Sequence, residues 1–126
     1  MKTYRLPVVL TGADGAASGN FRKSVAHGVI RAIQVDYNDQ PATCDVVLTC
    51  VFAGVTKTVL TLTDANTDFP LAKVFEAGKD NLGSDVAAGK VGELVEPEVA
   101  GELVATVAQG DAGAPGVVVT ALVDLR

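Results

Sequence analysis

Residues 43–52 read TCDVVLTCVF and contain the clearest alternation in the chain. Every second residue is apolar and would share one face of a strand: Cys44, Val46, Leu48, Cys50 and Phe52. Successive side chains of a strand point to opposite faces, so this period of two predicts a strand with one buried face. The pair Ala53-Gly54 that follows is short enough for a hairpin turn into a second strand at 55–63.

Outwards from this stretch, apolar runs alternate with clusters of Gly, Asp, Asn and Pro. The runs that are typical of strands cover residues 4–10, 21–25, 29–37, 71–76, 101–109 and 117–125. Turn chemistry fills residues 11–20, 38–42, 64–69 and 110–116. Residues 91–99 stay ambiguous, because Pro97 excludes a central strand over that whole length. No segment has a sustained helical period, and the chain has no repeat of 20–50 residues.

This spacing predicts an all-β fold in a single domain over residues 1–126. We expect an antiparallel β-sandwich of seven to nine strands, with jelly-roll-like or immunoglobulin-like connectivity. The Cys, Trp and Cys signature of immunoglobulin domains is absent. Residues 77–90, AGKDNLGSDVAAGK, are polar and Gly-rich without period, which predicts an exposed loop that is long for a compact domain and hence mobile or functional.

Composition and charge exclude several classes of protein. Hydrophobic residues make up 48% of the 126 residues, whereas disorder needs low hydrophobicity and high net charge. The 15 Asp and Glu against 10 Lys and Arg give a net charge of −5. An acidic surface repels phosphate backbones, so we expect no nucleic-acid partner. No apolar run approaches the ~20 residues of a membrane span, so we expect no membrane partner.

The two cysteines are expected to be buried free thiols. Cys44 and Cys50 lie on one predicted strand, where a rise of ~3.3 Å per residue separates their Cα atoms by ~20 Å. A disulfide needs a Cα separation below ~7 Å, which excludes a bridge between them unless the chain turns.

The candidate chemical motifs are all incomplete. Residues 64–68, DANTD, begin like a calcium loop, but Phe69 and Phe75 stand where Gly and Glu are needed, so an Asx-rich turn is the better interpretation. His27 is the only histidine, and Ser24 is not part of a G-x-S-x-G motif. The glycine-rich segments lack the phosphate-binding and dinucleotide-binding motifs. We expect no enzyme, no metal and no cofactor.

An acidic cluster is formed by Glu93, Glu96, Glu98 and Glu102. Paired carboxylates can hydrolyse glycosides, but those enzymes also need an aromatic surface on which sugars stack. We therefore expect a solvated acidic edge that guards an exposed strand against pairing with another molecule.

Four stretches, taken in order, resemble a known group of proteins: MKTYRLPVVLTGADGAASG, GVIRAIQVDYNDQPATCDVVLT, VLTLTDANTD and PEVAGELVATVAQGDAGAPGVVVTALVD. The series is similar to short tailed-bacteriophage proteins encoded among virion structural genes. Small β-sandwich proteins of this kind serve as capsid decoration, or cement, proteins. Residues 71–95 depart from the pattern, because a strand with aromatic residues would be expected there.

The resemblance implies a non-enzymatic virion structural protein, and first a decoration protein on the outer capsid surface that stabilises the shell. Its partners would be the major capsid protein and itself, as a homodimer or homotrimer. It would be made in the bacterial host cytoplasm and located in the virion. The alternatives are a tail or head–tail connector protein and a carbohydrate- or ligand-binding β-sandwich module.

The contact elements are expected to be the N-terminal strand and the loop at 77–90, because one is a terminal apolar strand and the other lacks period. The corresponding residues for contact with the capsid or another subunit are Tyr4, Leu6, Val8, Leu10, Leu82 and Val86.

Overall fold

The computed structural model describes residues 1–77 and 94–126, which contain strands and turns and no helix. The strands are β1 (Lys2–Leu10), β2 (Ala17–Asp36), β3 (Asp45–Phe52), β4 (Val55–Leu62), β5 (Phe69–Ala72), β6 (Glu76–Ala77), β7 (Leu94–Val95), β8 (Glu98–Gly110) and β9 (Gly113–Leu125). The predicted all-β class is confirmed. Over these residues there is no helix that is long and apolar enough to cross a membrane.

Seven strands form one antiparallel sheet in the order β1-β9-β2-β8-β3-β4, with β5 added to β2. β6 and β7 form a separate two-stranded pair. The hydrogen-bonded path is continuous from β1 to β4, so what the structure establishes is an open antiparallel sheet. The sandwich with jelly-roll connectivity is a finer interpretation of this path.

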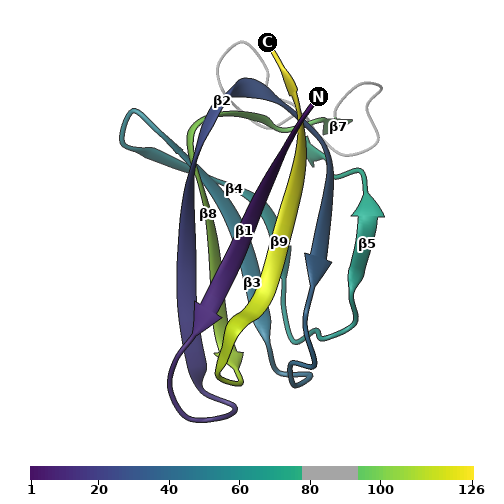
Figure 1. Ribbon diagram of the computed structural model, residues 1–126. Helices are drawn as coiled ribbons and strands as arrows, with labels where there is room; N and C mark the ends of the chain where they lie inside the picture. The colour runs from purple at the N-terminus through teal and green to yellow at the C-terminus, as the bar shows by residue number, and fades with distance from the viewer. Residues whose placement is uncertain (78–93) are drawn as a thin grey trace.

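β2 changes partner along its length, as Figure 1 shows. It pairs with β8 from Ala17 to Val29 and with β9 from Gly28 to Asp36, so Gly28 and Val29 have a partner strand on each side. Register shifts between Val25 and Gly28 and between Ile30 and Ala32 mark the irregular positions where the strand bends. One bent strand therefore joins the β8 side of the sheet to the β9 side.

The bend corrects two predictions. Residues 21–25 and 29–37 were expected as separate strands and are parts of β2, because the bulges keep the chain extended through the bend. The expected loop at 11–20 is shorter, because β2 begins at Ala17 and an isolated bridge pairs Thr11 with Ser18.

Strands from the two ends of the hydrogen-bonded path share one core. Alternate side chains of β1 and β9 are buried with those of β3 and β8 in a single hydrophobic cluster: Tyr4, Leu6, Val8, Val119, Ala121, Val123, Val46, Leu48, Leu103 and Ala105. β1 contacts β8 although the two are not neighbours in the path, and Figure 1 shows β1 and β9 in front of β3 and β8. The period of two in the sequence therefore corresponds to the core-facing side of each strand.

The remaining strand boundaries differ in detail from the prediction. The β3–β4 hairpin turns at Ala53-Gly54, both with positive φ (52° and 80°), as the sequence predicts. The strand expected at 71–76 is divided into β5 and β6, and the ambiguous stretch at 91–99 contains β7 and the start of β8. The turn expected at 110–116 is narrower, because β9 begins at Gly113. The loop predicted at 77–90 lies outside the described residues, apart from Ala77 in β6.

Candidate functional site

The side chains predicted as contacts on the N-terminal strand lie in the core. Tyr4, Leu6, Val8 and Leu10 are all at most 3% exposed. Tyr4 also accepts a hydrogen bond from the Ala26 backbone N–H at its hydroxyl (3.2 Å). A side chain inside the core cannot also contact another subunit, so these four belong to the fold rather than to a surface. The other two predicted contacts, Leu82 and Val86, lie outside the described residues.

Exposed apolar side chains gather instead at the end of the molecule that holds both chain termini. The register pairs Gly28 with both Leu125 and Val99 and pairs Val51 with Glu102, so the β2 bend, the β3–β4 hairpin and the start of β8 share this end. Figure 1 draws both termini at the top of the molecule. We call this the termini end. Its exposed apolar side chains are Met1, Phe52, Val55 and Leu125.

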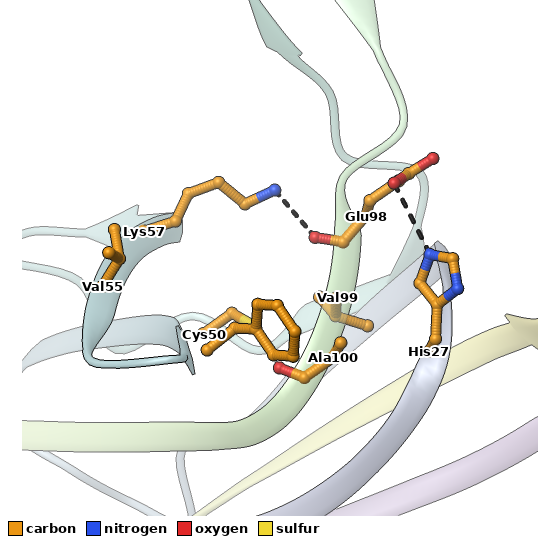
Figure 2. Close-up of a pocket in the computed structure, with 8 residues that line it drawn as sticks. His27, Cys50, Val55, Lys57, Glu98, Val99 and Ala100 are labelled. Atoms are coloured by element: carbon orange, nitrogen blue, oxygen red, sulfur yellow. Dashed lines mark hydrogen bonds and ion pairs between the residues drawn. The ribbon is translucent and has the colours of Figure 1, made fainter.

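A groove of about 570 Å³ opens at the termini end, between the β3–β4 hairpin and the β2 bend. Figure 2 shows Val55 and Lys57 on one side and His27 on the other, with Val99 and Ala100 between them. The groove is lined by His27, Cys50, Phe52, Val55, Lys57, Glu98, Val99 and Ala100. Phe52 and Val55 are 60% and 70% exposed. The core-facing side of the β3–β4 hairpin thus continues past the core and remains open.

Polar groups at the rim of the groove are already paired. Lys57 Nζ donates to the Glu98 carbonyl oxygen (2.7 Å) and to Glu76 Oε1 (3.2 Å). His27 Nε2 lies 3.6 Å from Glu98 Oε2. The Cys50 thiol donates to the Ala100 carbonyl (3.1 Å), which satisfies a buried polar atom. This arrangement leaves an apolar floor and a rim of both charges, which is suited to binding.

The acidic cluster predicted around β8 is resolved into separate ion pairs. Glu102 pairs with Arg22 (2.8 Å), Glu98 faces His27, and Glu96 pairs with Arg31 (2.7 Å). Glu93 lies outside the described residues. The expectation of an acidic edge is wrong, because β8 is an interior strand between β2 and β3.

Arg31 sits at the register shift of β2 and bridges two carboxylates. Its guanidinium donates to Glu96 and to Asp124 Oδ2 (2.9 Å). The hydrogen bond to Asp124 and the charge of Glu96 raise the pKa of Arg31, and the hydrogen bond from Arg31 lowers the pKa of Asp124. The bulge at Arg31 interrupts the alternation and turns this charged side chain away from the core, so that it pairs with Glu96 and Asp124.

The opposite end of the molecule is built from acidic turns. Its four turn segments, residues 11–16, 36–45, 63–68 and 109–116, contain no Lys or Arg. Their aspartates are Asp14, Asp36, Asp39, Asp45, Asp64, Asp68 and Asp111. We call this the acidic end.

Several of these aspartates cap backbone N–H groups. Asp68 Oδ1 accepts from the Tyr37 N–H, Asp45 Oδ1 from the Asp64 N–H, and Asp111 Oδ1 from the Gly15 N–H. Residues 64–68 connect β4 to β5, as expected of a turn, but Asp68 caps the N–H of Tyr37 in another segment rather than one in its own turn. No group of three or more potential metal ligands occurs within residues 1–77 and 94–126.

Both cysteines are buried free thiols, as predicted. Cys44 precedes β3, where burial raises the pKa of its thiol to about 11. Burial also raises the pKa of the Tyr37 hydroxyl to about 12, and this hydroxyl has no hydrogen-bond partner within the described part of the chain. Raised values keep both groups protonated at neutral pH, which disfavours a nucleophilic role.

Comparisons with family models, with curated proteins and with solved structures found no match in any of the three. The function is therefore argued from the residues of this chain. Sequence analysis missed the groove, although one signal pointed to it. The alternating apolar series of residues 44–52 ends at Phe52, directly at the hairpin turn, where nothing in the local sequence provides a cover.

Proposed function

We propose that this protein is a non-enzymatic structural component of a tailed-bacteriophage virion, namely a capsid decoration protein. In this role it binds the outer capsid surface, contacts the major capsid protein and stabilises the shell. It needs no cofactor for this task. The resemblance of its turn and strand series to small virion proteins suggests the class.

The contrast between the two ends of the molecule carries the proposal. The termini end has exposed Met1, Phe52, Val55 and Leu125 beside an apolar groove, whereas the acidic end has aspartates that cap backbone N–H groups of neighbouring turns. A protein that binds to another protein surface through one end needs an apolar end for the contact and a solvated end opposite to it. The negative charge of the acidic end also suits a position outside the shell, away from packaged DNA.

The remaining parts of the proposal follow from this role. The protein is made in the bacterial host cytoplasm and acts in the virion, without nucleic-acid or membrane partners. It associates with itself as a homodimer or homotrimer. The open sheet is interpreted as a jelly-roll-like β-sandwich in which the bend of β2 connects two layers.

Co-sedimentation with expanded, protein-depleted capsids of the source phage tests the function. We expect saturable binding at a fixed ratio to the major capsid protein. If the protein is present in virions but does not bind the capsid, its role is in the tail or the head–tail connector. Absence from virions would overturn the structural role.

A matched pair of variants tests which end binds. Leu125→Asp places a charge at the termini end, and Val9→Asp places the same charge on β1 at a similar exposure (45% and 52%). We expect at least tenfold weaker capsid binding for Leu125→Asp and unchanged binding for Val9→Asp. Equal effects of the two variants would contradict docking through the termini end.

A ligand-binding module is the second candidate, and the groove favours it. Its volume of about 570 Å³ falls in the range of small-molecule sites, and its floor is apolar. A carbohydrate ligand would have Phe52 as its stacking surface in the groove, because both tyrosines are buried. Saturable binding of an apolar fluorescent probe that Phe52→Ser abolishes would support this candidate.

A further inference from the structure

The two ends of the sheet path, β1 and β4, are protected to different degrees. Each pairs with one neighbour among the described residues, β1 with β9 and β4 with β3. β1 contains Arg5 and Pro7, and charged residues and prolines are common protections against edge-to-edge pairing. β4, with the sequence VTKTVLTL, contains no proline and one charge, Lys57. Its β-branched residues make it a good template for another strand.

The hairpin geometry determines which backbone groups of β4 face outwards. Phe52 pairs with Val55 across a two-residue turn, and such a flanking pair exchanges both its hydrogen bonds. The backbone N–H and C=O groups of successive residues in a strand point to opposite sides, so those of Thr56 and Thr58 point away from β3. Both side chains are exposed. A register shift opposite Leu48 and Thr49 places a bulge at Val59, so the regular edge that is unpaired among residues 1–77 and 94–126 is Val55–Thr58.

The single charge on this edge is already neutralised. The Lys57 ammonium is held by the Glu98 carbonyl and by Glu76 Oε1. It therefore leans over the groove rather than along the edge (Figure 2). A charge that is paired in this way opposes the approach of a second strand much less than a free lysine would.

We propose that β4 pairs antiparallel with β4 of a second copy of this chain, in a two-fold symmetric dimer. Thr56 of each copy faces Thr58 of the other, because this register uses all the outward-facing backbone groups of Val55–Thr58. Two Thr–Thr pairs form, which is a favourable cross-strand combination. The same register places Lys57 of each copy opposite Lys57 of the other, and each ammonium keeps its own partners, the Glu98 carbonyl and Glu76 Oε1. The added strand also lies along the exposed Val55.

The charge distribution favours a second copy over a foreign strand. The rim beside β4 carries a cation (Lys57) and anions (Glu98, Glu76), as a self-complementary two-fold interface requires. The negative turns lie at the acidic end, away from the start of β4. Two copies joined here keep those charges apart, although each copy has a net charge of −5.

The inference rests on the proposed homo-oligomer, and its test uses the purified protein without capsids. Sedimentation velocity over a concentration series is compared for the wild type, for Thr56→Lys and for Thr3→Lys. Thr3 is an exposed residue of β1, the protected edge, so Thr3→Lys is the matched control. Far-ultraviolet circular dichroism and thermal unfolding establish that each variant folds.

We expect a dimer for the wild type and for Thr3→Lys, and at least tenfold weaker association for Thr56→Lys. Lysine there adds like charges across the two-fold axis and an unpaired charge to the edge. A dimer that Thr56→Lys leaves intact would overturn the β4 interface while leaving a homo-oligomer in place. A wild-type monomer throughout would overturn the dimer, and capsid co-sedimentation would still test the decoration role.

A cross-link tests the register without depending on affinity. Opposed residues of a hydrogen-bonded pair lie ~5.5 Å apart at Cα, which is within disulfide range. An oxidised mixture of Thr56→Cys and Thr58→Cys chains should form mixed disulfide dimers, whereas neither variant alone should cross-link. The native Cys44 and Cys50 are buried and do not compete. Cross-linking of Thr56→Cys with itself would contradict the register.

Discussion

Replacement of Gln40 by Ala should strongly destabilise the acidic end through the loss of hydrogen bonds. Gln40 is only 5% exposed and holds the β8–β9 turn through its side chain. Its Nε2 donates to the carbonyls of Asp111 and Gly116 (3.2 Å each), and its Oε1 accepts from the Asp111 N–H (2.6 Å). One amide therefore satisfies three backbone groups that lie more than 70 residues away in sequence.

The expected loss for Gln40→Ala is about 3 kcal/mol. Each of the three hydrogen bonds contributes about 0.5–1.5 kcal/mol net, and a buried carbonyl left without a partner costs about 1–3 kcal/mol. The Gly116 carbonyl is buried at this contact, whereas water can reach Asp111 in part. In a domain of this size, about 3 kcal/mol corresponds to a fall in Tm of roughly 10 °C.

A nearly isosteric variant separates lost volume from lost hydrogen bonds. In Gln40→Glu the carboxylate still accepts from Asp111 but faces the carbonyls of Asp111 and Gly116 without a proton to donate. The folded state therefore raises the pKa of this carboxyl above its unfolded value of ~4.3. Stability is then greatest below that value and is lost as the pH rises through the folded pKa.

Urea unfolding followed by circular dichroism at pH 4 and pH 7 measures both effects. We expect Gln40→Ala to lose about the same free energy at both values, and Gln40→Glu to lose clearly more at pH 7. A loss below ~0.5 kcal/mol for Gln40→Ala would refute the assignment of this side chain as the link between the two turns, because that is the size of an ordinary surface substitution.

Four further substitutions test other parts of the fold. The hydrogen bond from Arg31 lowers the pKa of Asp124, so this ion pair stabilises the fold above the unfolded pKa of Asp, and that stability is lost as the pH falls through the folded pKa. Arg31→Met should therefore make the free energy of unfolding depend less on pH in this acidic range. Burial raises the pKa of Cys44 to about 11, so stability should fall as the pH rises from about 9 towards 11, and Cys44→Ala should weaken that dependence in alkaline unfolding curves. Gly101→Ala should cost more than about 2 kcal/mol in urea unfolding, since φ is +82° and its Cβ would lie 2.5 Å from a carbonyl oxygen of β3. Gly54→Ala, at a φ of +80° with open space around it, should cost about 1 kcal/mol, and equal losses for the two glycines would contradict the steric argument.

The parts of the fold that the sequence predicts are those with local causes. The strand at residues 45–52 follows from its alternation, and the turn at Ala53-Gly54 follows from its composition. The continuity of β2 has no such local signal. It depends on a bulge at Arg31, which appears in the sequence only as an interruption of the alternation. It also depends on two partners, β8 and β9, that begin 67 and 82 residues after Arg31 in the sequence. Pairing over such distances is decided by the whole sheet.

The error about the N-terminal strand has a physical cause that also explains why the groove was missed. An apolar alternation indicates that a face is covered, but it does not say by what. On β1 the alternating face is covered by the protein's own core, so Tyr4 and Leu6 are not contacts. On β3 the same alternation runs from Leu48 in the core to Phe52 beyond it, where the cover ends. Only the position of the β2 bend and of β8 decides where the core stops, and neither is encoded in residues 43–52. The apolar face that extends beyond the strands that cover it is therefore the best candidate for a binding surface, and in this protein that face lies at the β3–β4 hairpin.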